Sequence, residues 1–284
     1  MSLKNKICLV CFDNFIDGKP QLGLPTFDEL IQALYFSLIN LGYEVTFKKN
    51  DLNTDALNIL VASHRLFHSF EKIEFKGEFV VLNFEQLSRD YAKLYSAKKD
   101  QIRFENYHNF LEKNYVIDYS ESNKKILKNN VIRFRLGFFD FGFKAEKKSE
   151  NSYLFYGAVT EHRANILTSL KDKYSLEILQ NVWGFERDYK LSKTHAVLNI
   201  QKKQEKTPLE VYRLWHALCF GNVIFSEKGS DESLYKDYLP YVTFTDDFNS
   251  VNLEIDESKI NRAQKFKEET SFSSNLNQIL KALL

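Results

Sequence analysis

Glycine, proline, cysteine and long apolar runs are all scarce in this sequence. Its 284 residues include 10 glycines and 4 prolines, and this scarcity indicates regular elements joined by compact turns, with little disorder. No apolar run approaches the roughly 20 residues that a membrane span requires. The opening residues, MSLKNK, lack the apolar core of a secretory signal. We therefore expect a cytoplasmic protein without a transmembrane segment.

The three cysteines are too few and too scattered for a zinc site or a disulfide framework. Cys8 and Cys11 form a C-x-x-C, but it lies in the strand-like run ICLVCF, where alternation places the two side chains on opposite faces. Cys219 stands alone, so no second pair completes a metal site. We expect buried structural thiols in a reducing compartment and no metal.

An excess of charge of either sign is also missing. The chain has 39 basic and 38 acidic side chains, and this balance argues against a dedicated binder of nucleic acid or of membrane surfaces. It leaves room for a local basic pocket that binds a small anion. The 25 phenylalanines and a hydrophobic content of 44% are sufficient for one large core or two domains.

Apolar runs in the first half predict a doubly wound α/β domain. Residues 6–12 are expected to form a parallel strand, and Thr26 is expected to cap a helix over 27–41 that leads to a strand at 45–48. This is a βαβ unit with a right-handed crossover. Residues 13–25 are expected to be a polar loop. Later strand-like runs occupy 57–62, 79–83, 116–119 and 132–136.

The charged stretch KAEKKSENS, residues 144–152, is the best candidate for a linker. After it the pattern of strands and helices restarts, which predicts an N-terminal domain over 1–148 and a C-terminal domain over 149–284. Both are expected to be Rossmann-like and to face a central cleft. The tail, residues 259–284, has a helical pattern and is expected to pack back across the joint. Strands are expected at 153–156, 176–179, 197–200, 223–225 and 242–244.

The stretch 207–232 combines a helix start with a buried strand. Thr207 is expected to cap a helix that begins at Pro208, with Glu210 completing a capping box. The unpaired N–H groups and the dipole at such a helix start favour an anion. Glu227 follows the strand 223–225, and ligands of open α/β sheets bind outside the carboxyl ends of the strands. The pattern predicts an anion site beside a carboxylate.

Several local motifs resemble one enzyme family. They are FYGAVTEHRANIL (155–167), NVWGFERD (181–188), AVLNI (196–200) and LEVYRLWHALCFGNVIFSE (209–227), with fainter likeness in VLNFEQL (81–87) and VIDYSESN (116–123). In order and spacing they resemble nucleotide-sugar-dependent glycosyltransferases of the GT-B fold, of the group-1-like bacterial and viral type. The resemblance covers most of the chain.

The resemblance implies that the C-terminal domain holds the donor's diphosphate and ribose, without an obligatory metal or a cofactor. Glu210 and Arg213 match the family's Glu-x-x-Arg helix, Glu227 matches the strand end after it, and Arg163 matches the basic position after the turn at Gly157. Guanidinium groups suit this task because they bind phosphate in a bidentate way.

The sequence departs from the family at His216, where many GT-B enzymes carry a glutamate. Structural interpretations also stand beside the functional ones. Arg213 is equally a surface residue paired with Glu210, and Glu210 is equally a capping residue. Trp183 either stacks on a nucleobase or belongs to the core. His216 is interpreted as a packed or partly exposed helix histidine.

The N-terminal domain is expected to supply the catalytic base. Asp13 follows the first strand, His64 follows the strand 57–62, and Glu85 follows the strand 79–83. Catalytic residues are concentrated in such loops. For each residue taken singly, a structural or solvent-facing role is the commoner one.

We therefore expect a metal-independent glycosyltransferase that moves a sugar from a nucleotide sugar to a hydroxyl acceptor. The acceptor class stays open between a glycan, a lipid-linked saccharide and a protein, and nucleic acid is not an expected partner. Two alternatives stay open: a catalytically silent module of the same fold that binds a nucleotide or a saccharide, and a sugar-nucleotide epimerase of that fold.

Overall fold

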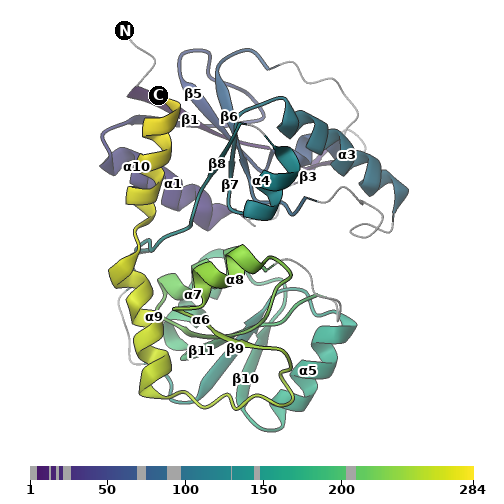
Figure 1. The fold of residues 1–284 in the computed structure, drawn as a ribbon, viewed down its shortest axis with the longest axis vertical. Coiled ribbons are helices and arrows are strands. Elements are labelled where there is room, and N and C mark those ends of the chain that lie inside the picture. The colour runs from purple at the N-terminus through teal and green to yellow at the C-terminus, as the bar shows by residue number, and fades with distance from the viewer. Residues whose placement is uncertain are drawn as a thin grey trace. The chain divides into compact units, whose positions relative to one another are not determined.

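The chain forms two compact units, each built around one parallel sheet (Figure 1). The computed structural model describes residues 5–12, 14–16, 19–21, 27–68, 75–87, 97–128, 130–143, 148–202 and 209–284. The first unit comprises Met1–Arg135 together with Ser273–Leu284, and the second comprises Leu136–Phe272.

The first unit contains a six-stranded sheet in the order β4-β1-β5-β6-β7-β8, in which every pair is parallel. The central strands are buried runs of branched side chains, as expected for a sheet covered on both faces. The strands are β1 (Lys6–Cys11), β4 (Glu44–Lys49), β5 (Leu57–Val61), β6 (Phe79–Asn83), β7 (Val116–Asp118) and β8 (Val131–Arg133).

Four helices of the first unit precede or connect its strands, and α10 joins this unit from the C-terminal end of the described chain. Their bounds are α1 (Asp28–Asn40), the short 3-10 helix η2 (Ser63–His68), α3 (Lys98–Glu112), α4 (Glu121–Leu127) and α10 (Phe272–Leu283). The N-cap of α1 is Phe27, which makes no side-chain cap bond, and Thr26 lies outside the described residues. Cys8 is fully buried and Cys11 is half-buried, and neither forms a disulfide.

The expectation that residues 13–25 form a polar loop without strands is wrong. Two short antiparallel strands, β2 (Asn14–Ile16) and β3 (Lys19–Gln21), pair there with Phe15 opposite Pro20. The intervening sequence is Asp-Gly, the dipeptide most typical of a tight hairpin, and this signal predicts the pairing better than the polarity of the segment does.

The second unit contains a five-stranded parallel sheet in the order β10-β9-β11-β12-β13. Its strands are β9 (Ser152–Tyr156), β10 (Ser175–Leu179), β11 (Ala196–Asn199), β12 (Val223–Glu227) and β13 (Thr243–Thr245). Its helices are α5 (Glu161–Lys171), α6 (Gly184–Lys193), α7 (Val211–Cys219), α8 (Glu232–Tyr238) and α9 (Glu257–Glu269).

The structure divides the chain between Arg135 and Leu136, earlier than the charged stretch that the sequence indicates. The segment after this point already bonds within the second unit: the Phe138 N–H donates to Thr270 Oγ1 at 2.9 Å. Lys148 donates from Nζ to the carbonyl of Phe220 at 2.9 Å, at the C-terminal end of α7. Residues 144–147 of the expected linker lie outside the described residues.

The tail, predicted to be helical over 259–284, forms the two helices α9 and α10. Thr270, with an extended backbone, ends α9, and its hydroxyl donates to the carbonyl of Phe266. The chain then enters α10, which belongs to the first unit: Ser273 Oγ lies 2.8 Å from Ser37 Oγ on α1, and Leu276 and Leu280 are buried. In the described part of the chain, no helix combines the length and apolar character that crossing a bilayer demands.

Candidate functional site

The carboxyl ends of β9, β11 and β12 bring several predicted residues of the second unit together. Gly157 directly follows β9, and Arg163 lies near the start of α5. Glu227 is the last residue of β12, and Arg213 lies in the first turn of α7. This is the edge of a parallel sheet at which ligands bind.

Arg163 is fully buried, and each of its three nitrogens donates to a protein oxygen. Nε donates to the carbonyl of Ile200 at 2.9 Å, Nη1 to that of Ala158 at 2.8 Å, and Nη2 to Glu210 Oε1 at 2.6 Å. Burial lowers the pKa of Arg163, and the Glu210 carboxylate opposes that effect. Arg163 therefore holds Glu210 and the backbone at Ala158 and Ile200 in place.

Arg213 binds the other oxygen of the Glu210 carboxylate. Its Nη2 lies 2.6 Å from Glu210 Oε2, and its Nη1 donates to Asn199 Oδ1 at 2.9 Å. Asn199 in turn donates from Nδ2 to Ser226 Oγ at 2.9 Å, which ties β11 to β12. Burial by itself would raise the pKa of Glu210, but Arg213 and Arg163 together lower it below its usual value. Glu210 is therefore a carboxylate between two guanidinium groups.

Gly157 leaves the space that Arg213 needs. Its φ is +128°, and a Cβ at this position would lie 2.8 Å from Arg213 Nη2. Only glycine combines this backbone conformation with such a close approach.

The expectation that the helix after Thr207 begins at Pro208 is wrong. Helix α7 begins at Val211, and Glu210 is its N-cap residue without a side-chain cap bond. The carboxylate is engaged by the two arginines, and so it is not used to close a capping box. Thr207 and Pro208 lie outside the described residues.

Glu227 is paired with a histidine that sequence analysis missed. His162 Nε2 lies 3.1 Å from Glu227 Oε1, and the backbone N–H of Gln201 donates to Oε2 at 2.6 Å. His162 and Glu227 are 65 residues apart, so no local spacing reveals the pair. Both side chains remain partly accessible.

Trp183 and His216 lie farther along the same unit. Trp183 precedes α6 and is half-buried, with the Arg187 guanidinium 5.6 Å from the ring centroid. His216 is fully buried, and its Nε2 lies 3.1 Å from Asp188 Oδ1. Burial lowers the pKa of His216. The position where the family carries a glutamate is thus a packed histidine, and nucleobase stacking on Trp183 stays a prediction.

In the first unit, two of the three candidate bases meet. His64 Nε2 lies 3.4 Å from Glu85 Oε1, at the carboxyl ends of the neighbouring strands β5 and β6. Burial lowers the pKa of His64, while Glu85 raises it and the charges of Arg65 and Arg103 lower it. Asp13 lies outside the described residues.

A buried polar network, which sequence analysis missed, supports this pair. Asn83 donates from Nδ2 to Asp118 Oδ2 at 2.6 Å and accepts from the Tyr107 hydroxyl at 2.9 Å. The side-chain carbonyl of Asn83 also accepts from the backbone N–H of Glu85 at 3.1 Å. Asn123 donates to the backbone carbonyl of Glu85 at 2.9 Å. The network fixes the backbone from which Glu85 projects towards His64.

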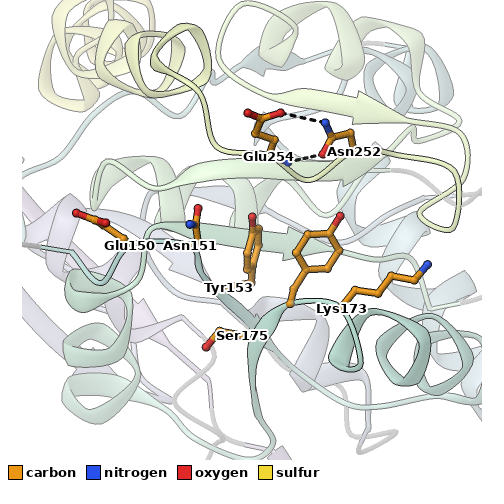
Figure 2. Close-up of a pocket in the computed structure, with 8 residues that line it drawn as sticks. Glu150, Asn151, Tyr153, Lys173, Ser175, Asn252 and Glu254 are labelled. Carbon is orange, nitrogen blue, oxygen red and sulfur yellow. Dashed lines mark hydrogen bonds between the residues drawn. The ribbon is translucent and has the colours of Figure 1, made fainter.

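A cavity of about 490 Å³ lies at the opposite end of the second sheet, beside the first residues of β9 and β10 (Figure 2). Tyr153 in its wall donates to the carbonyl of Leu253 at 2.6 Å, and Asn252 bonds to Glu254. The predicted donor residues at the carboxyl strand ends do not line it. Its polar groups hold the segment 252–254 against the sheet.

The two units, each a parallel sheet with connecting helices, are Rossmann-like, and together they define a GT-B fold. Solved structures bear this out. A mutant of TarM from S. aureus, in complex with fondaparinux, α-GlcNAc-glycerol and UDP, is similar to this chain with a TM-score of 0.51 and 11% identity. The match covers 81% of this chain and 55% of that one, so this chain spans little more than half the length of TarM.

AviGT4, a glycosyltransferase involved in avilamycin A biosynthesis, matches over nearly the whole length of both proteins. Its TM-score is 0.51 at 12% identity, covering 97% of this chain and 91% of AviGT4. No protein-family model matches the chain, and no curated protein sequence matches it. The chain therefore has the GT-B fold, and at this level of identity the likeness establishes the fold alone.

Proposed function

We propose that this protein is a glycosyltransferase that moves a sugar from a nucleotide-sugar donor to a hydroxyl of an acceptor. The observation that carries the proposal is the Glu210 carboxylate between Arg163 and Arg213, at the carboxyl ends of the strands in a Rossmann-like unit. The TarM structure of the same fold contains UDP, and AviGT4 is described as a glycosyltransferase, which supports the proposal.

The donor is assigned to the second unit. Transfer breaks the bond between the anomeric carbon and the diphosphate oxygen, so the negative charge of the leaving group must be stabilised. Arg213, at the first turn of α7, supplies a guanidinium near the positive end of the helix dipole. Glu210 retains 27% of its side-chain exposure and accepts hydrogen bonds from hydroxyls of the donor. Arg163 acts through Glu210 as a positioning residue.

The acceptor is assigned to the first unit, where His64 takes the proton of the attacking hydroxyl. A neutral imidazole is needed for this step, and burial favours the neutral form by lowering the pKa of His64. Glu85, 3.4 Å away, orients the ring and stabilises the imidazolium that forms. The new bond joins the acceptor oxygen to the anomeric carbon.

The proposal includes independence from metal ions and cofactors. Arginine side chains and a helix start neutralise diphosphate charge as a divalent cation would. Activity that survives EDTA supports this part of the proposal, and activity that returns only on adding Mg²⁺ or Mn²⁺ contradicts it.

The test begins with thermal unfolding in the presence of UDP, GDP, CDP and dTDP. A nucleotide at 100 times its Kd stabilises the native state by about 2.7 kcal/mol, which is readily measured. The corresponding nucleotide sugars are then assayed for hydrolysis without acceptor. Stabilisation with slow hydrolysis supports the transferase. Stabilisation without any turnover points to a silent binding module, and interconversion of two epimeric donors points to an epimerase.

A further inference from the structure

A second cavity, of about 350 Å³, lies in the first unit between the end of β8 and α10. It is separate from the His64–Glu85 pair, because none of the network residues lines it. Its walls come from segments that are distant in sequence and meet because α10 returns to the first unit (Figure 1). The lining residues are Ile132, Arg133, Arg135, Asn275, Gln278 and Ile279.

Two arginines give this cavity its charge. Arg133 is the last residue of β8, Arg135 follows two positions later, and both line the cavity. Arg133 Nη1 lies 3.5 Å from Glu121 Oε1, so one carboxylate offsets part of the charge. Arg135 is exposed. Two guanidinium groups therefore lie in the wall of the cavity.

The remaining walls combine apolar and amide groups. Ile279 is buried and Ile132 is half-buried, and they form an apolar surface. Asn275 donates from Nδ2 to the Arg135 carbonyl at 2.8 Å, which fixes the strand end relative to the helix. Gln278 on the next turn of α10 is exposed. Apolar surface with a few convergent polar groups is typical of small-ligand sites, and amides suit the hydroxyls of a sugar.

The cavity lies at the same end of the sheet as the candidate base. In the strand order β5-β6-β7-β8, His64 follows β5 and Arg133 ends β8. Three strand spacings separate them, about 14 Å at roughly 4.8 Å per strand. An extended acceptor lying across the strand ends would span that distance.

We propose that this cavity binds an anionic group, a carboxylate or a phosphate, carried by a saccharide acceptor at a sugar remote from the reacting hydroxyl. This inference rests on the proposed function, because it assigns the ligand to the acceptor. Guanidinium forks recognise both oxyanions in a bidentate way, and the isoleucine and amide walls hold the attached sugar ring.

The test uses the full chain and three small probes: glucose 6-phosphate, glucuronate and glucose. Binding is measured by calorimetry at low ionic strength. We expect at least one anionic probe to bind at least tenfold more tightly than glucose, and the stronger one identifies the anion as phosphate or carboxylate. Arg135→Gln is expected to weaken binding of that probe about tenfold. Arg262→Gln, at an exposed arginine on α9, is expected to leave its affinity unchanged.

Several outcomes overturn the inference. Equal affinity for glucose and for both anionic probes shows that charge plays no role in binding. If Arg135→Gln binds the anionic probe with unchanged affinity, the probe does not bind in this cavity. If inorganic phosphate binds as tightly as glucose 6-phosphate, the cavity is an anion site that does not recognise the sugar. Nucleotide titrations separate the two proposals. If UDP binds but neither anionic probe does, this inference alone is wrong. If none of the nucleotides binds, the proposed function is wrong. Circular dichroism confirms that each variant is folded.

Discussion

At the scale of single residues, the second unit is organised around one carboxylate. Glu210 accepts from Arg163 through one oxygen and from Arg213 through the other. Removing Glu210 would leave both guanidinium groups without this carboxylate, a costly outcome in a protein interior. Arg163, with three internal partners, is a supporting residue, and Arg213 is the arginine better placed to reach a ligand because its side chain keeps 10% of its exposure.

Replacing Arg213 by alanine is expected to weaken binding of a nucleoside diphosphate by about 1.5–3 kcal/mol, the usual value of a hydrogen bond to a charged group. Calorimetric titration with the nucleotide that stabilises the fold measures the change. Arg262→Ala serves as the matched control for loss of a positive charge, because this arginine is exposed on α9. An unaltered Kd in Arg213→Ala, with the control also unaltered, removes Arg213 from the site.

Replacing Glu85 by glutamine is expected to shift the pH dependence of activity. Glu85 raises the pKa of His64, while burial already lowers it below 6.5. Without the carboxylate the pKa of His64 falls further, so the neutral base persists to lower pH. The acidic limb of the kcat/KM profile should therefore move to lower pH in the variant. A limb that stays in place, or moves to higher pH, contradicts His64 as the base.

At the scale of elements, sequence patterns located most strands to within a residue or two. The predicted strands 79–83 and 153–156 correspond closely to β6 (Phe79–Asn83) and β9 (Ser152–Tyr156), because buried parallel strands read as short apolar runs. The start of α7 was misplaced. Capping propensity is a local signal, and here the Glu210 side chain is bound by Arg213 on α7 and by Arg163, which is 47 residues away in the chain.

The turn at Gly157, after β9, allows a test of how closely the backbone packs against Arg213. Gly157→Ala is expected to destabilise the second unit by more than about 1 kcal/mol, because the new methyl group meets Arg213 Nη2 at 2.8 Å in addition to the strained φ. Gly42→Ala is the matched control, since Gly42 also has a positive φ, +89°, but no atom lies within 4 Å of its added Cβ. Denaturant unfolding of both variants gives the comparison. Equal losses would mean that backbone strain alone accounts for the effect.

At the scale of the whole molecule, the chain passes from the first unit to the second and returns. A charged, apolar-poor stretch at 144–152 is a reasonable marker of a linker, yet the division falls at Arg135–Leu136. The actual crossing is apolar and aromatic, LGFF, and it packs in the second unit, where Trp215 Nε1 donates to the Gly137 carbonyl at 2.7 Å. Composition cannot reveal a linker that is itself part of a core. The His162–Glu227 pair was missed for a related reason, because tertiary contacts alone bring it together.

The return of the chain predicts that α10 stabilises the first unit. Leu280 is fully buried on α10, and its replacement by alanine is expected to cost about 2–5 kcal/mol, as for other buried leucines. Lys281→Ala, an exposed neighbour on the same helix, is the control and should change little. Hydrogen exchange followed by mass spectrometry should show faster exchange in β1 and α1 of Leu280→Ala, with β11 and β12 of the second unit unchanged. If protection is lost in β11 and β12 while β1 and α1 keep theirs, α10 supports the second unit, and the assignment of residues 273–284 to the first unit is wrong.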